Sequence, residues 1–324
     1  MLLKNLEYLS ALARERHFAR AAAACRVTQP TLSAGIKQLE EEMGVLIVER
    51  GQRYRGLTPE GHRILAWAQR ILADVEHLSQ EVSEMRSGLV GRVRIGVIPV
   101  MLPIVSLLTS PFAERHPRVS ITILSLSSIE IQRGLDGFAL DAGLTYLDNE
   151  PLSHVRTFPL YRERCLLLTP ADGPFGDREA VTWREASTLP LCLLTPDMQN
   201  RRIIDSHFRE AGAEPRPSVE TNSIVTLCSH LRAGTWSSVM PHAILYLVGE
   251  MPGVRAIPLV DPTDSHALGL IVPDRDPLPP ITRALVEIAQ QTDVSGALER
   301  ELAPALSAPS GDGAGQRSRR RSAY

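Results

Sequence analysis

The sequence predicts a multidomain chain: an all-α N-terminal winged helix-turn-helix, a long linker helix and a C-terminal two-lobed α/β domain. Three observations support this prediction. Apolar residues recur at helical spacing up to Met43, a seven-residue apolar repeat occupies 64–85, and strand and helix patterns alternate from Gly91 onward. The 324-residue length leaves room for two or three domains.

The first two helices are predicted from apolar spacing and composition. A stripe with spacings of three and four residues indicates a helix at the N-terminus and consists of Leu2, Leu6, Leu9 and Ala13. The alanine-rich run 18–25 follows after a short break, and alanine is the strongest helix former. Its small side chains allow another helix to approach closely.

The third helix and the wing complete the first domain, residues 1–58. A helix over Gln29–Met43 is predicted because Thr28 is a good N-cap and Gly44 is a helix stop. The β-branched run 45–48 and the polar stretch before Leu57 then fit a two-stranded wing.

The linker helix, residues 59–88, carries the most informative pattern in the sequence. Thr58 and Pro59 form a helix start, and a helix from there to about Ser87 would be ~43 Å long. Alternating spacings of four and three indicate the seam of a coiled coil, formed by Ile64, Ala68, Ile71, Val75, Leu78, Val82 and Met85. This seam predicts dimerisation. The alternative is an amphipathic helix packed on its own chain.

Short strands that alternate with helices fill the rest of the chain. Strand patterns at 93–97 and 119–124 lie among helical stretches at 101–115 and 129–135, which predicts a largely parallel sheet. Because the alternation is too long for one small sheet, we expect two lobes with a ligand crevice between them. The domain is predicted at 89–300, with lobe I at about 91–160 and 267–295 and lobe II at about 161–266.

Residues 301–324 are predicted to form a disordered basic tail, because the segment has few apolar residues with which to order itself. Its arginines would add nonspecific attraction to phosphate, and a plain solvated tail is the alternative. These arginines are Arg317, Arg319, Arg320 and Arg321.

Composition argues against membrane-spanning and disulfide-stabilised classes of protein. No apolar run approaches the roughly 20 residues of a transmembrane helix, and charges interrupt the N-terminus, so we expect a cytoplasmic protein with no membrane partner. Cys165 follows Arg162 and Arg164, a weak indication of a redox thiol, and incidental thiols are the alternative. The four cysteines lie far apart, at Cys25, Cys165, Cys192 and Cys228.

No catalytic residue, metal site or cofactor is predicted. The sequence has no G-x-S-x-G elbow, no phosphate-binding glycine loop and no metal-spaced cluster, and its nine histidines are scattered. We therefore do not expect an enzyme.

Residues 17–44 resemble the signature of the LysR family of bacterial transcriptional regulators. In that family a Phe and an alanine-rich helix precede the pattern Q-P/S-x-L-S-x-x-I-x-x-L-E-x-x-L-G, which here ends with Met43 in place of the usual Leu. The segment 57–61 also matches, and the resemblance extends to about Gln290. It implies binding to double-stranded promoter DNA by a homodimer, commonly assembled into a homotetramer.

Physical chemistry and the resemblance point to the same DNA-binding residues. The first turn of the third helix offers short polar side chains and a proline edge that fit a major groove about 12 Å wide. Predicted base contacts are Gln29, Pro30, Thr31 and Ser33, and predicted phosphate contacts are Lys37, Arg50 and Arg53. Residues 1–60 carry nine positive and seven negative charges, within a chain of net charge -2. The alternative is a helical hairpin whose polar face is merely solvated.

By resemblance, residues 92 onward form a two-lobed effector-binding domain that takes a small-molecule co-inducer at the lobe interface. Free N–H groups at a helix start favour anions such as carboxylates. Matching positions are Pro99, Val100, Met101, Ser127, Ser128, Gln199, Asn200, Arg201, Asn222, Ser223 and Trp236. Relatives often carry Thr or Ser at the position of Val100, so this chain lacks a hydroxyl that those relatives offer to a ligand. Trp236 would narrow the pocket or be a core residue. Arg201 or Arg202 would pair with a carboxylate of the effector or be helix-surface charge.

The predicted function is a sequence-specific DNA-binding transcriptional regulator whose promoter binding or bending is modulated by a small, anionic effector. RNA polymerase is a further candidate partner. The alternatives are a small-molecule-binding protein without a DNA role and an enzyme, and the motif at 17–44 opposes both.

Overall fold

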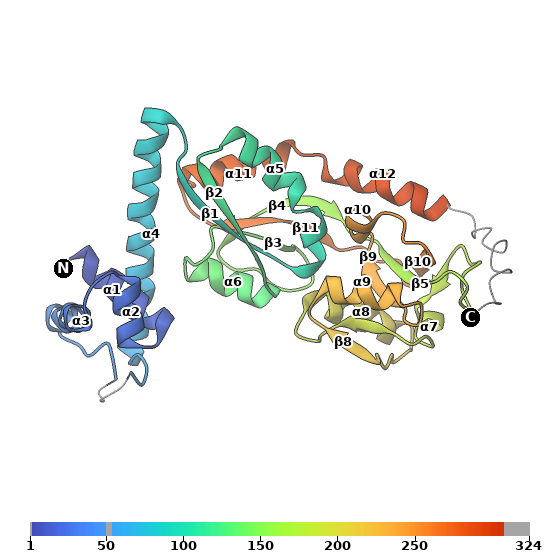
Figure 1. The fold of residues 1–324 in the computed structure, drawn as a ribbon, viewed down its shortest axis with the longest axis horizontal. Helices are drawn as coiled ribbons and strands as arrows, with labels where there is room; N and C mark the ends of the chain where they lie inside the picture. The colour runs from blue at the N-terminus through green and yellow to red at the C-terminus, as the bar shows by residue number, and fades with distance from the viewer. Residues whose placement is uncertain (1, 50–53, 308–324) are drawn as a thin grey trace, which may run out of the picture.

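The computed structural model describes residues 2–49 and 54–307, and it confirms the predicted fold class. A helical domain and one long helix stand at one end, and an α/β domain of two lobes extends away from them (Figure 1). Within the described ranges, no helix combines the length and apolar composition needed to cross a membrane.

The N-terminal domain is a small helical core. Its helices are α1 (Leu3–Glu15), α2 (Phe18–Ala24) and α3 (Gln29–Met43). Leu6 and Leu9 are buried as the stripe predicts, whereas Leu2 precedes the helix and is 59% exposed. Helices α1 and α3 pack so closely that a Cβ on Gly35 would lie 2.6 Å from the ring of Tyr8.

Local signals set the bounds of α3 and the wing. Thr28 caps α3 by accepting from the backbone N–H of Thr31 at 3.4 Å, and Gly44 ends it with a φ of 68°. Val48 and Leu57 then form an antiparallel bridge at the base of the wing. The predicted start and end of α3 are confirmed.

Helix α4 (Pro59–Ser87) follows the wing and has the bounds that its caps predict. The Thr58 hydroxyl accepts from the backbone N–H of Gly61 at 2.9 Å. A Cβ on Gly61 would collide with the carbonyl oxygen of Ile47, so only glycine allows this approach of helix to wing.

Lobe I is built on a five-stranded sheet of order β2-β1-β3-β11-β4. Its strands are β1 (Gly91–Val97), β2 (Val119–Ser125), β3 (Ala142–Tyr146), β4 (Val155–Arg162) and β11 (Ala267–Pro273). Its helices are the 3-10 helix η1 (Pro99–Ile104), α5 (Ser106–Arg115), α6 (Ser128–Asp136) and α11 (Pro280–Gln291).

Lobe II contains a four-stranded sheet of order β6-β10-β5-β9 and a two-stranded sheet of β7 and β8. Its strands are β5 (Cys165–Pro170), β6 (Val181–Thr182), β7 (Cys192–Leu194), β8 (Val219–Thr221), β9 (Ser238–Pro241) and β10 (Val254–Val260). Its helices are α7 (Trp183–Ala186), α8 (Gln199–Glu210), α9 (Ile224–Arg232) and α10 (Ile244–Val248).

The prediction of a largely parallel sheet is confirmed for lobe I, where β11 alone runs against the other four strands, and is wrong for the four-stranded sheet of lobe II. In lobe I, β1 pairs in parallel with β2 and β3, but β11 runs antiparallel to both β3 and β4. In lobe II, β5 runs antiparallel to β9 and β10. The direction of β11 follows from the path of the chain: β4 leaves lobe I and β11 returns to it beside β4, so the two strands point in opposite directions.

The C-terminal helix α12 (Val294–Ser307) lies along both lobes and packs against β4, β10 and α10 (Figure 1). Leu298 and Leu302 are buried in this contact. The predicted disordered tail therefore does not begin at 301, because the apolar side chains of this helix extend the fold to 307. The rest of that tail, with its four arginines, lies outside the described residues.

Candidate functional site

The outer face of α3 presents the polar residues that the sequence assigns to DNA. Leu32, Ile36 and Leu39 are buried against the N-terminal core, which turns the opposite face outward. That face is exposed and carries Gln29, Pro30, Thr31, Ser33 and Lys37. The predicted contacts Arg50 and Arg53 lie outside the described residues.

Acidic side chains on α3 have structural partners. Glu40 Oε1 accepts from the backbone N–H groups of Ile47 and Val48 at 2.7 and 3.0 Å, and so fixes the start of the wing. Lys37 Nζ lies 3.5 Å from Glu41 in an exposed pair, which is weak enough to release the lysine to a phosphate.

The predicted seam of α4 divides into two parts. Ala68 is buried and Ile64 and Ile71 are half-buried against the N-terminal core, as the alternative of packing on the same chain requires. The other four side chains form an exposed apolar row, which we call the α4 row: Val75 (40% exposed), Leu78 (65%), Val82 (46%) and Met85 (81%).

Another face of α4 forms ion pairs with lobe I. Arg275 Nη1 lies 3.1 Å from Asp74 Oδ1, and Arg283 Nη2 lies 2.8 Å from Glu84 Oε2. The Arg275 guanidinium also lies 4.3 Å from the ring centre of Phe138. These contacts join residues about 200 positions apart, so sequence spacing gave no signal for them.

The cleft between the lobes contains a cavity of about 10 Å³. That volume is close to the minimum for one water molecule, so the lobes are nearly closed here. Six predicted effector contacts line this cavity, namely Pro99, Val100, Ser127, Ser128, Gln199 and Asn200.

The two serines of this closed cavity differ in their hydrogen bonding. Ser127 caps α6, and its hydroxyl and backbone N–H each lie 2.8 Å from a Glu130 carboxylate oxygen. The Ser128 hydroxyl is buried and has no hydrogen-bond partner among the described residues. A buried hydroxyl without a partner is the one that a ligand would satisfy.

Other predicted effector contacts lie elsewhere. Asn222 and Ser223 line a second, open cavity of about 460 Å³ that shares Pro99 with the closed one. Met101 is fully buried in the core of lobe I. Trp236 lines neither cavity and packs on the core, with its ring centre 6.3 Å from that of His230.

Arg201 has neither of the roles weighed from the sequence. It is 6% exposed, and it donates to Asp205 at 2.8 Å and to Glu220 at 2.6 Å. The guanidinium is therefore already paired with two carboxylates of lobe II and does not face a ligand in the cleft. The neighbouring Arg202 instead pairs with Glu150 of lobe I at 2.6 Å and so links the two lobes.

A buried polar chain also crosses the cleft. The Tyr146 hydroxyl of lobe I donates to Glu163 at 2.8 Å and accepts from the Asn200 amide of lobe II at 2.9 Å. Burial raises the pKa of Glu163 to about 8, which keeps the carboxyl largely protonated at neutral pH. Sequence reasoning missed Tyr146 and Glu163 because their partners are distant along the chain.

Comparisons with known proteins cover both domains. The family model "LysR substrate binding domain" matches residues 86–293, and "Bacterial regulatory helix-turn-helix protein, lysR family" matches residues 3–62. The DNA-binding transcriptional dual regulator OxyR of Escherichia coli (strain K12) is 30% identical over 283 residues, which are 86% of this chain and 91% of the relative.

Two further relatives are similar over most of the chain. A probable hydrogen peroxide-inducible genes activator of Streptomyces viridosporus is 31% identical over 244 residues, 74% of this chain and 77% of its own length. The structure of a full-length OxyR variant from Pseudomonas aeruginosa superposes with a TM-score of 0.73 at 27% identity, covering 90% of this chain and 95% of that one. The relatives are regulators of transcription and not enzymes.

Proposed function

The chain belongs to the LysR family of DNA-binding transcriptional regulators, and on that premise we propose how it reads DNA and senses a ligand. The exposed first turns of α3 are the part of the chain that would contact DNA. Gln29 and Ser33 offer hydrogen-bonding groups to base edges, Pro30 and Thr31 offer apolar contacts to thymine methyl groups, and Lys37 reaches a phosphate. Two such helices, one from each protomer, would occupy neighbouring major grooves.

Dimerisation follows from the α4 row. Four neighbouring apolar side chains exposed on one helix form a surface that a second copy of the same helix would bury. By likeness to the family we further propose a tetramer made of two dimers, contact with RNA polymerase at the promoter, and a cytoplasmic location.

The effector is proposed to bind at the closed cavity between the lobes. Pro99 and Ser128 belong to lobe I and Asn200 to lobe II, so a ligand there would bind both lobes and bias them between open and closed arrangements. Because the cavity has room for about one water, the lobes must move apart to admit anything larger. The expectation of an anionic effector loses Arg201 as support, because its guanidinium is paired with Asp205 and Glu220. The start of α6 is already occupied by the Glu130 carboxylate, so the expectation now depends on the helix start at Pro99 alone.

Thiol-based sensing is not favoured for this chain. A cysteine reacts with peroxide as the thiolate, which requires a low pKa. Burial instead raises the pKa of every cysteine thiol, and raises that of Cys192 to about 11. We therefore propose that reversible ligand binding, and not cysteine oxidation, modulates this regulator.

Thermal shift on the full-length protein tests the effector site. The panel consists of small carboxylates and neutral metabolites of similar size, since a ligand at 100 times its Kd stabilises by about 2.7 kcal/mol. Ser128→Ala should reduce the shift that the best ligand gives, while Ser106→Ala, on the exposed start of α5, should retain it. Equal shifts in both variants would place the ligand elsewhere.

Anisotropy with labelled DNA tests the regulator itself. Binding to a preferred site should persist to a higher salt concentration than binding to a scrambled duplex, because base contacts add to phosphate attraction. Parallel loss on both duplexes would argue for a small-molecule-binding protein without a specific DNA role.

A further inference from the structure

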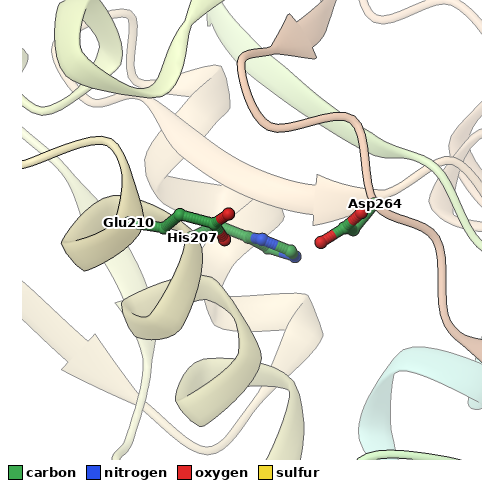
Figure 2. A group of neighbouring side chains, drawn as sticks. All are labelled: His207, Glu210 and Asp264. Carbon is green, nitrogen blue, oxygen red and sulfur yellow. The ribbon is translucent and has the colours of Figure 1, made fainter.

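Three potential metal ligands meet on lobe II, away from both cleft cavities. His207 and Glu210 lie one turn apart on α8, and Asp264 lies on the connection between β10 and β11. The three offer one nitrogen and two carboxylate oxygens within 4.8 Å of one another. Figure 2 shows the His207 ring directed toward Asp264, with Glu210 on the same helix beside it.

His207 is a buried polar group without an assigned role. Its side chain is only 4% exposed, and neither ring nitrogen has a hydrogen-bond partner among the described residues. A buried polar group left without a partner costs about 1 to 3 kcal/mol, so such groups are rare in native structures. Since two acids stand beside this ring, a shared cation is the partner that would satisfy all three.

We propose that His207, Glu210 and Asp264 bind one divalent transition-metal cation. One imidazole and two carboxylates are ligands that Zn²⁺ and its first-row neighbours accept, whereas Mg²⁺ and Ca²⁺ prefer oxygen alone. Glu210 and Asp264 are exposed, which leaves the remaining coordination positions to water. The i, i+3 spacing places His207 and Glu210 on one helical face, as a shared ion requires.

The surroundings of the cluster are already ordered. The Trp183 ring centre lies 4.8 Å from that of His207, and the Trp183 indole N–H donates to the Pro262 carbonyl at 2.9 Å. The connection that bears Asp264 is therefore held near α8 before any ion binds.

The site has a mechanical consequence for the two lobes. Asp264 lies four residues after β10 ends at Val260 and three before β11 starts at Ala267, on the segment by which the chain returns to lobe I. A cation would attach that segment to α8 of lobe II. Metal occupancy would thus stiffen one of the connections about which the lobes open.

Equilibrium dialysis of the tag-free, full-length protein against Zn²⁺ tests the proposal. We expect one saturable ion per chain, with weaker uptake of Mn²⁺ by the usual order of affinities and little of Mg²⁺. Asp264→Asn should weaken Zn²⁺ binding about tenfold or more. Glu214→Gln, a nearby exposed acid outside the cluster, should leave binding unchanged and serves as the control.

A second readout keeps the proposal falsifiable where a variant folds poorly. Co²⁺ bound at His207 should quench the fluorescence of the neighbouring Trp183, and excess Zn²⁺ should restore it by competition. Asp264 is exposed, so its substitution by Asn should not disturb folding. Absence of a saturable ion in the wild type, or unchanged Zn²⁺ affinity in folded Asp264→Asn, would overturn the proposal.

Discussion

At the scale of single residues, the exposed face of α3 separates two tasks. Gln29 lies at the exposed start of the helix, where its amide can pair with a base edge. Lys37 lies two turns further along and carries a charge on a long side chain suited to phosphate. One group would choose the site, and the other would strengthen binding to any site.

Substitutions of these two residues should therefore have different effects. We expect Gln29→Ala to weaken the free energy of binding to the preferred site by about 1 to 3 kcal/mol and to change binding to scrambled DNA little. The difference in affinity between the two duplexes should therefore become smaller. Lys37→Ala should weaken binding to both duplexes equally and reduce the dependence of the affinity on salt concentration. Anisotropy titrations of both variants on both duplexes check this, and an identical pattern in the two would contradict the assignment.

Glu163, on the connection between β4 of lobe I and β5 of lobe II, makes the stability of the protein depend on pH. Its folded pKa is about 8, above the ordinary value of 4.5, so between these pH values the folded state holds the extra proton. Stability from this group is thus complete at low pH and is lost as the pH rises toward 8, by at most about 1.4 kcal/mol per unit. Glu163→Gln removes the titration and should flatten this decline.

Urea denaturation of both proteins between pH 5.5 and 8 measures the effect. His242, whose pKa burial lowers to about 4, changes stability in the opposite sense below pH 6.5. Both proteins contain His242, so its contribution cancels when the free energy of unfolding of the wild type is subtracted from that of the variant. This difference should grow with pH in favour of the variant. A constant difference across the range would show that Glu163 is ionised throughout.

At the scale of elements, local signals predicted the helices well. Thr28 and Gly44 bound α3 as expected, and Thr58 and Pro59 start α4, because caps and backbone conformation depend on a few neighbouring residues. Strand direction was not predictable in this way, since the pairing of β4 with β11 depends on where the chain returns after lobe II.

The candidate effector site was predictable only in part, for a related reason. Ser127 and Ser128 follow a strand and begin a helix, a local pattern. Arg201 is neutralised by Glu220, which lies on β8, and the chain gives no sequence signal for that contact. The network of Tyr146, Glu163 and Asn200 is likewise a product of tertiary packing alone.

The α4 row is the element that we expect to control dimerisation. Leu78→Asp would place a carboxylate in the buried seam of the dimer, where desolvation is strongly unfavourable. Because Leu78 is 65% exposed in a single chain, the protomer should stay folded. Sedimentation velocity should show a smaller species for Leu78→Asp, with circular dichroism unchanged.

Ser83→Asp is the matched control, because it adds the same charge to α4 outside the seam. It should sediment as the wild type does. A loss of assembly in both variants would indicate a general effect of charge on the helix. If Leu78→Asp sediments as the wild type does, the seam is not the dimer interface.

At the scale of the whole molecule, α4 lies between the DNA-binding and the ligand-binding domains. Arg275 and Arg283 of the effector domain attach to Asp74 and Glu84 of this helix. A movement of lobe I would therefore displace α4, the helix that positions α3. Partly exposed ion pairs are individually weak, at about 0.2 to 1 kcal/mol, so this attachment can be released.

Removing both arginines should loosen α4 without unfolding either domain. In the double variant Arg275→Gln and Arg283→Gln we expect several-fold faster amide hydrogen exchange along the C-terminal half of α4. Arg115→Gln, which removes an exposed arginine of lobe I that donates to Gln291 of α11, should leave that exchange unchanged. Unaltered exchange in the double variant would mean that the ion pairs do not hold the helix.

The central claim is that two copies, paired along α4, present two α3 helices to DNA at a fixed separation. The most direct measurement is binding of the purified protein to sites selected from random DNA, with about 5 or about 10 base pairs inserted between the half-sites. The account predicts that half a helical turn abolishes tight binding and that a full turn largely restores it. Equal affinity at every spacing would contradict it.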